Sequence, residues 1–194
     1  MEPQFVAAFT NFEDLPNSDL VELAIVGRSN CGKSSLINAL SGKNKLARTS
    51  RTPGRTRQLV FFSLSLDDSP LFHLVDLPGY GFAKISKVQK RAFEKFVPQY
   101  IDSRNQLKAL LLLNDLRRKP GDEEQSILRW AKDRKLTTLV VLTKADKLSK
   151  NRRFAAVEST QKILGLNKRP LVSSIHEKQS IQDLRRAVVD LLWR

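Results

Sequence analysis

The chain has 194 residues and a formal net charge of +14, because 34 Lys and Arg stand against 20 Asp and Glu. This length fits one domain with a sizeable core, and 41% hydrophobic and 28% charged residues exclude an intrinsically disordered chain. No run approaches the ~18 apolar residues of a membrane span. The single cysteine excludes an internal disulfide, and the N-terminus lacks a signal-peptide pattern, so we expect a cytoplasmic protein.

Strands and helices are predicted to alternate along the chain, from short apolar runs and from apolar residues at helical spacing. The predicted strands are 21–26, 58–66, 71–76, 110–113, 137–142 and 171–174. The predicted helices are 33–40, 88–101, 122–133, 153–164 and 181–193. Pro98 is expected to break or kink the second helix. The strands on either side of the turn cluster 67–70 should form an antiparallel hairpin.

This order predicts an α/β fold with a mostly parallel sheet and helices on both faces. We expect residues 20–194 to form a single domain and residues 1–19 to be an N-terminal extension. Ligands of such sheets bind at the carboxyl ends of the strands, so the loops there should carry the chemistry.

The loop after the first predicted strand matches the phosphate-binding pattern G-x-x-x-x-G-K-S. Its residues are Gly27, Arg28, Ser29, Asn30, Cys31, Gly32, Lys33 and Ser34. The glycines let backbone N–H groups surround phosphate oxygens at a helix start, where the helix dipole favours negative charge. We expect Lys33 to reach the β- and γ-phosphates and Ser34 to ligate Mg²⁺. An ordinary glycine-rich turn is the alternative interpretation.

Asp76-Leu77-Pro78-Gly79, at the end of the strand after the hairpin, matches the pattern D-x-x-G. The Asp76 carboxylate can hold Mg²⁺ directly or through water. The backbone N–H of Gly79 can approach the γ-phosphate because no Cβ blocks it. Taken alone, this pattern is also typical of a plain turn.

Thr143-Lys144-Ala145-Asp146, after the apolar run 139–142, looks like the guanine-reading [N/T]-K-x-D motif of GTPases. Asp146 can accept hydrogen bonds from N1–H and the exocyclic amine of guanine, and adenine has no donor at either position. The Lys144 stem can lie along the base. Thr143 stands where Asn is commoner, which leaves its link to the phosphate loop open. A helix N-cap is the alternative role for Asp146.

A second loop should complete the base site. It holds Ser173, Ser174 and Ile175, which follow the last predicted strand. Backbone groups here are expected to contact guanine O6.

Together these motifs resemble the EngB (YihA/YsxC-type) family of bacterial GTPases, in the TrmE-Era-EngA-EngB group. The match spans residues 20 to 192. Besides the motifs above, the matching segments in this range are Ser35, Thr52-Pro53-Gly54-Arg55-Thr56, Tyr80-Gly81, Asp115-Leu116-Arg117 and Trp130. The resemblance implies a P-loop NTPase of the Ras-like G-domain type, with a six-stranded sheet that contains one antiparallel hairpin strand. It also implies GTP, GDP and Mg²⁺ binding, a role in assembling the large ribosomal subunit, and an effect on cell division and septation.

The resemblance assigns Thr56 as the switch threonine that joins Mg²⁺ when the γ-phosphate is present. On spacing alone, Thr49 and Thr52 compete with it. Cys31 departs from the family, which usually has Val or a similar small apolar residue there. A thiol at this position could make nucleotide binding sensitive to oxidation.

Hydrolysis is expected to be slow without help. Tyr80 follows Gly79 at the place where many GTPases have a water-orienting Gln, and a phenol cannot position water in the same way. A partner or a monovalent cation would then raise the rate. Related GTPases use a phosphate-loop Asn to hold K⁺, which makes Asn30 the candidate K⁺ site, with a hydrogen bond inside the loop as the alternative. No residue is assigned as a catalytic base.

Basic residues gather beside the predicted switches. Residues 43–57 hold six Lys or Arg and no acid, and residues 84–119 hold ten against three acids, a net +7. We expect this surface to bind RNA in the GTP form, with a plain solvated face as the alternative. Tyr80, Phe82 and Phe93 could add base stacking, and core packing is the alternative for Phe93.

The predicted protein is a monomeric, Mg²⁺-dependent GTPase that docks on rRNA or ribosomal proteins of the large subunit in its GTP form. One rival is a structural, self-assembling GTPase that acts directly in septation. The others are an enzyme that couples hydrolysis to another reaction, and a P-loop kinase or ATPase.

Overall fold

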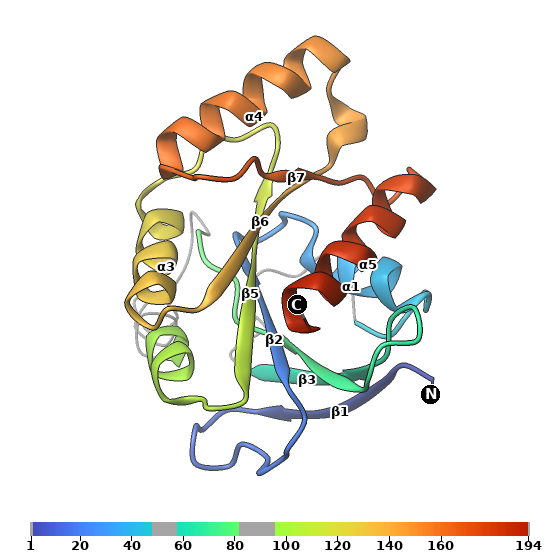
Figure 1. Cartoon of the computed structure of the whole chain (residues 1–194), viewed down its shortest axis with the longest axis vertical. Coiled ribbons are helices and arrows are strands. Elements are labelled where there is room, and N and C mark those ends of the chain that lie inside the picture. The colour runs from blue at the N-terminus through green and yellow to red at the C-terminus, as the bar shows by residue number, and fades with distance from the viewer. Residues whose placement is uncertain (1, 48–57, 82–95, 194) are drawn as a thin grey trace.

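The computed structural model describes residues 2–47, 58–81 and 96–193 (Figure 1). Their centre is a seven-stranded sheet in the order β1-β3-β4-β2-β5-β6-β7. The strands are β1 (Gln4–Phe9), β2 (Glu22–Gly27), β3 (Leu59–Leu64), β4 (Phe72–Asp76), β5 (Leu107–Asp115), β6 (Thr137–Thr143) and β7 (Leu171–Val172). Among these strands β3 is the one that runs antiparallel to its neighbours, and all other pairings are parallel.

The helices lie where the apolar spacing predicts them. They are α1 (Lys33–Ser41), α3 (Asp122–Asp133), α4 (Lys150–Leu164) and α5 (Lys178–Trp193), with a short 3₁₀ helix at Ala145–Lys147. Residues 96–103 are also helical, so Pro98 does not end the helix there. The earlier part of that predicted helix, 88–95, lies outside the described residues. No helix in the described part of the chain is long and apolar enough to cross a membrane.

The core lies on both sides of the sheet because β2, at its centre, is buried at every position. Leu23 and Ile25 point to the face that α1 and α5 cover. Ala24 and Val26 point to the opposite face, which α3, α4 and the helical residues 96–103 cover. Figure 1 shows these two layers of helices on either side of the sheet. The predicted fold class, a P-loop α/β domain with helices on both faces, is therefore confirmed.

The count of six strands was wrong by one strand, β1, which lies inside the predicted N-terminal extension and pairs with β3 at the sheet edge. Phe9 packs edge-on against Phe61, with 5.5 Å between ring centroids, and Phe5 packs against Phe62 at 6.2 Å. A bulge between Phe5 and Ala7 shifts the register, so the two β1 aromatic residues reach opposite faces. The bulge therefore breaks the alternation by which a strand is recognised in sequence.

Candidate functional site

The phosphate loop joins the carboxyl end of β2 to the first turn of α1. A Cβ on Gly27 would lie 2.8 Å from the carbonyl oxygen of Leu113 and 2.7 Å from Cys31 Sγ, so only glycine fits against β5 here. Gly32, directly before the helix, has a φ of 102°, which favours glycine. The chain can therefore turn tightly and present its backbone N–H groups at the helix start, as the motif predicts.

Lys33 and Asp76 meet at the mouth of this loop, and the Lys33 ammonium donates to the Asp76 carboxylate. Both side chains are largely buried. Burial raises the pKa of the Asp76 carboxyl, and the charge of Lys33 opposes this rise. The phosphates of a nucleotide would require this ammonium, and its Mg²⁺ would require this carboxylate. The two groups already lie side by side.

The oxygen donors near Asp76 suit Mg²⁺. Ser34 lies in the first turn of α1, and Asp76 ends β4. Across the described ranges, no cluster of three or more His, Cys, Asp or Glu could hold a metal by itself. Mg²⁺ in NTP sites is held by one or two protein groups together with phosphates and water, so this sparse set fits the ion. Thr56, the third predicted ligand, lies outside the described residues.

The D-x-x-G segment contacts the phosphate loop directly. The backbone N–H of Ser29 donates to the carbonyl oxygen of Tyr80 at 2.7 Å. Arg28 Nε donates to the carbonyl oxygen of Gly81 at 3.3 Å. These contacts bring Gly79 beside the loop, which is where a γ-phosphate sensor must lie.

The side chain of Tyr80 points away from this contact. It is 2% exposed, and its hydroxyl donates to Glu124 Oε1 on α3 at 2.9 Å. Tyr80 therefore cannot stack on RNA in this structure, so that interpretation was wrong: its ring belongs to the apolar cluster between the sheet and α3. Phe82 and Phe93 lie outside the described residues.

Thr143 makes the link that its departure from Asn left open. Its hydroxyl donates to the carbonyl oxygen of Cys31 at 2.5 Å, which ties the end of β6 to the phosphate loop. Lys144, at a φ of 60°, sends its ammonium to the carbonyl oxygen of Asn30 at 2.5 Å. The phosphate loop and the base loop are therefore joined by two hydrogen bonds.

Asp115 is a site residue whose role the sequence did not indicate beyond the family match. It ends β5 and lies 3.2 Å from the ammonium of Lys144, and both its oxygens accept from Arg117. Burial raises the pKa of this carboxyl, but the stronger combined effect of Arg117 and Lys144 lowers it to about 2. Asp115 is therefore ionised, and it holds the Lys144 ammonium so that the stem of this lysine could lie along a guanine base.

Asp146 faces the loop after β7. Ser174 Oγ donates to Asp146 Oδ1 at 2.9 Å, and the Lys147 ammonium lies 3.1 Å from Oδ2. Burial raises the pKa of the Asp146 carboxyl, but these two partners bring it below its ordinary value, so the group is an ionised acceptor. The backbone N–H of Ala145 also donates to the carbonyl oxygen of Ser173 at 3.2 Å.

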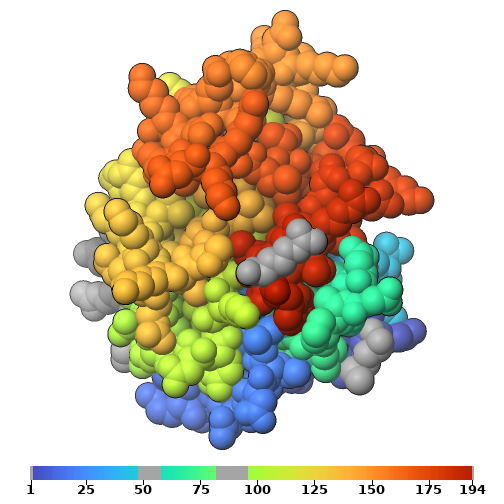
Figure 2. Space-filling model, in the orientation of Figure 1, coloured from blue at the N-terminus to red at the C-terminus, as the bar shows by residue number. Residues whose placement is uncertain are grey.

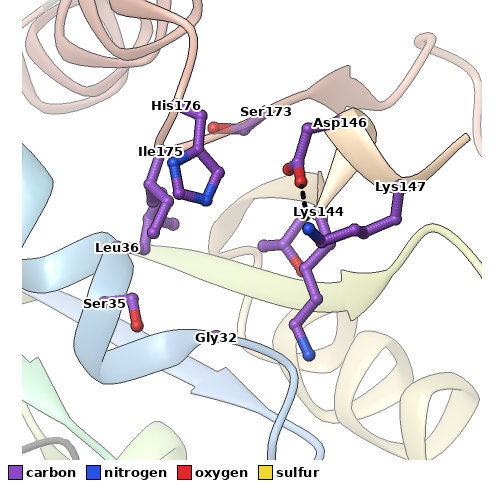
Figure 3. Close-up of a pocket in the computed structure, with 10 residues that line it drawn as sticks. Gly32, Ser35, Leu36, Lys144, Asp146, Lys147, Ser173, Ile175 and His176 are labelled. Atoms are coloured by element: carbon purple, nitrogen blue, oxygen red, sulfur yellow. Dashed lines mark ion pairs between the residues drawn. The ribbon is translucent and has the colours of Figure 1, made fainter.

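These loops surround a pocket (Figure 3). Its lining residues are Gly32, Ser35, Leu36, Thr143, Lys144, Asp146, Lys147, Ser173, Ile175 and His176. In Figure 3, Ile175 and His176 stand on one side and Asp146, Lys144 and Lys147 on the other, with a dashed line between the Asp146 carboxylate and the Lys147 ammonium. Leu36, Lys147 and His176 were not predicted as site residues, because an apolar helix residue and single basic residues just after the two base-loop segments give no signal of a site. The pocket joins the phosphate loop to the base loop, as a nucleotide site must.

Cys31 lies inside the fold rather than at the pocket surface. It is 2% exposed, and burial raises the pKa of its thiol to about 11. The thiol is therefore protonated at neutral pH and reacts poorly, which argues against an oxidation-sensitive nucleotide site.

Sequence comparisons place the chain in a known family. A family model described as "50S ribosome-binding GTPase" matches residues 22–144. A "Probable GTP-binding protein EngB" from Syntrophomonas wolfei is 36% identical over 184 residues, covering 95% of this chain and 93% of that protein. A protein of the same name from Syntrophotalea carbinolica is 44% identical over 163 residues, covering 84% and 77%.

Solved structures share the fold. The crystal structure of a probable GTP-binding protein engB matches with a TM-score of 0.71 at 20% identity, over 89% of this chain and 98% of that one. Era in complex with MgGDPNP and nucleotides 1506–1542 of 16S ribosomal RNA matches with a TM-score of 0.73 at 21% identity, over 90% and 57%. From the family model and the two relatives, this chain belongs to the EngB family of GTP-binding proteins and is a GTPase.

Proposed function

We propose that this GTPase is a nucleotide-switched assembly factor for the large ribosomal subunit, acting as a monomer in the cytoplasm. The description of the matching family model, a 50S ribosome-binding GTPase, supports the choice of subunit. The bound 16S rRNA fragment in the Era structure supports RNA as a partner for this fold. The net charge of +14 supports a polyanionic partner for this chain itself.

The nucleotide would be held by the phosphate loop, the D-x-x-G segment, the base loop and the loop after β7. Its hydrolysis is GTP + H₂O → GDP + phosphate. Lys33 would turn from Asp76 to the β- and γ-phosphates, and Ser34, Asp76 and Thr56 would supply oxygens to Mg²⁺. That ion neutralises phosphate charge when it is bound. Asp146 would read guanine, and the segment from Ser173 to Ile175 would close over the base.

The observation that carries the switch proposal is the hydrogen bond between Ser29 and the carbonyl oxygen of Tyr80. In this proposal a γ-phosphate would draw the N–H of Gly79 toward itself and so disturb the contact at the next residue, Tyr80. The Tyr80 phenol would pass the movement to Glu124, whose other oxygen accepts from the backbone N–H of Gly121 at 2.7 Å. GTP would in this way act on the turn before α3.

That turn carries part of the basic surface. Arg117, Arg118 and Lys119 are exposed just before Gly121, so the path from Tyr80 ends at charges that can bind phosphate. Arg104, from the same basic segment, pairs with Glu22 at 2.6 Å and is 11% exposed, so it belongs to the core. Much of the remaining charge lies in 48–57 and 82–95, outside the described residues.

Co-sedimentation with purified large-subunit particles tests the proposal. We expect more protein in the pellet with a non-hydrolysable GTP analogue than with GDP, and less of it at high salt because phosphate contacts are screened. Equal amounts in the two nucleotide states would contradict the switch.

The effect on septation would then follow from a shortage of ribosomes. The rival, a GTPase that assembles into filaments at the septum, requires a dimer or polymer across the nucleotide face. Gel filtration with the GTP analogue separates the two, because the proposal predicts a monomer and the rival predicts a larger species.

A further inference from the structure

A second basic region lies away from the switches. Residues 147–169 hold seven Lys or Arg against one acid, Glu158, a net +6 within a chain of net +14. The basic residues are Lys147, Lys150, Arg152, Arg153, Lys162, Lys168 and Arg169. They belong to α4 and its flanking loops, a region here called the α4 surface. It shares no residue with the two basic segments beside the switches.

Most basic side chains of the α4 surface are exposed to solvent and form no ion pair within the described residues. Helix α4 lies at one end of the molecule, beyond β6 and β7 (Figure 1), and long side chains project from it there (Figure 2). Its two buried residues are Val157 and Thr160. Five of its basic side chains are exposed and form no ion pair with any acid in the described part of the chain: Lys150, Arg152, Lys162, Lys168 and Arg169.

An exposed aromatic ring lies within this charge. Phe154 is 52% exposed, and the guanidinium carbon of Arg169 lies 5.0 Å from its ring centroid. Leaving so much apolar area in water is unfavourable, and a stacked nucleobase would remove it. Cationic side chains around an exposed aromatic ring are the arrangement by which proteins bind single-stranded nucleic acid, because phosphates meet the charges and bases meet the ring.

A membrane surface fits the α4 surface less well. A helix that lies in a lipid interface presents a stripe of large apolar side chains. On the described part of α4, Phe154 is the one large hydrophobic residue that is exposed. One ring among many charges is enough for a base and too little for a lipid interface.

We propose that the α4 surface binds unpaired RNA, with Phe154 stacking on a base and the lysines and arginines contacting phosphates. This inference rests on the proposed function, since the RNA would be that of the large subunit. The contact is independent of the γ-phosphate. Helix α4 follows the base loop, and Arg153 fixes its first turn by donating to the carbonyl oxygen of Leu148 at 3.0 Å and to Glu177 at 2.9 Å.

Fluorescence anisotropy with labelled oligouridine measures this contact directly. The variant Phe154→Ala should weaken binding by about tenfold through the lost stacking. The triple variant Lys150→Gln, Arg152→Gln, Lys168→Gln should flatten the slope of log affinity against log salt by up to about 2, at ~0.7 for each single-strand phosphate. Both effects should be equal with GDP and with the GTP analogue.

The matched control removes the same charge elsewhere, by Lys132→Gln, Arg134→Gln, Arg186→Gln, all exposed on α3, the turn after it and α5. Oligouridine affinities of the α4 variants equal to those of this control would overturn the inference. The inference would also be overturned if Phe154→Ala abolished binding to phosphatidylglycerol vesicles and left oligouridine binding unchanged.

Failure here is distinguishable from failure of the proposed function. If the α4 variants match the control while unaltered protein still prefers large subunits in its GTP form, the α4 inference alone is wrong. If the α4 variants lose oligouridine binding while unaltered protein shows no nucleotide preference for subunits, the α4 contact stands and the switch proposal fails.

Discussion

The phenol of Tyr80 is turned toward Glu124 rather than toward the phosphate loop. Replacing Tyr80 by Phe should therefore leave kcat for GTP within about twofold, because the hydroxyl does not face the reacting phosphate. The free energy of unfolding should fall by about 1–3 kcal/mol, since a buried carboxylate loses a donor. Steady-state phosphate release and urea unfolding measure the two quantities.

Tyr100→Phe is the matched control, because the other tyrosine of the chain also donates to a buried carboxylate, Glu22, at 2.5 Å. Glu22 keeps its ion pair with Arg104, so this variant should lose less stability than Tyr80→Phe. A fall of more than about tenfold in kcat for Tyr80→Phe, with unchanged stability, would show instead that the phenol acts in hydrolysis.

Asn30 is available to a cation. It has a φ of 63° and is exposed, and within the described residues its side chain makes no hydrogen bond, so the alternative of a bond inside the loop is not seen. We expect GTP turnover to be faster in KCl than in NaCl, because a held K⁺ would stabilise negative charge in the transition state. Asn30→Ala should remove the difference. Equal turnover of unaltered protein in the two salts would exclude the K⁺ site.

At the scale of elements, β4 carries a buried titratable group at the end opposite to Asp76. His73 packs edge-on against Phe61 and is 6% exposed, and its Nδ1 has no hydrogen-bond partner among the described residues. Burial lowers the pKa of this imidazole below 6.5, nearby Glu22 raises it and Arg104 lowers it again. The folded state therefore holds the neutral imidazole, and the unfolded chain binds a proton more readily.

The stability of the nucleotide-free protein should consequently fall as the pH drops through 6.5. His73→Leu should reduce this loss between about pH 7.5 and about pH 5.5, and the matched variant His176→Asn, at the exposed second histidine, should not. Urea unfolding at the two pH values measures the slope. Equal slopes for all three proteins would contradict the assignment, and Asp115 does not interfere because its carboxyl titrates at lower pH.

The elements that the sequence predicts well are those with a local signal. Helix α3 has the predicted bounds, Asp122–Asp133, because acidic residues follow Gly121 at its start and apolar residues recur at helical spacing. Strand β1 was missed because its partner β3 is about 50 residues away in the chain and a bulge disturbs its alternation.

The site residues also fall into those with a local signal and those without one. Motif spacing predicts Gly27 to Ser34, Asp76 and Asp146 as site residues. The roles of Asp115 and Leu36 depend on which strands and helices become neighbours, which motif spacing does not show. The orientation of the Tyr80 side chain toward the core also depends on α3, because Glu124 on that helix accepts a hydrogen bond from the Tyr80 hydroxyl.

At the scale of the whole molecule, the excess charge separates into regions with different expected dependence on nucleotide. The turn before α3 lies at the end of the path from the D-x-x-G segment, whereas the α4 surface follows the base loop. GTP should therefore change part of the affinity for RNA and leave the rest constant. Partial rather than complete release from large subunits in the GDP form is the expected behaviour.

The central claim is that a guanine nucleotide held between the phosphate loop and Asp146 controls docking on the large subunit. Asp146→Asn exchanges an acceptor for a donor amide, which suits the carbonyl that xanthine carries in place of the guanine amine. The measurement is co-sedimentation of this variant with large subunits, in non-hydrolysable guanosine and xanthosine triphosphate analogues. We predict that the variant docks with the xanthosine analogue and fails with the guanosine analogue, the reverse of the unaltered protein. Undiminished docking of the variant with the guanosine analogue would contradict the account.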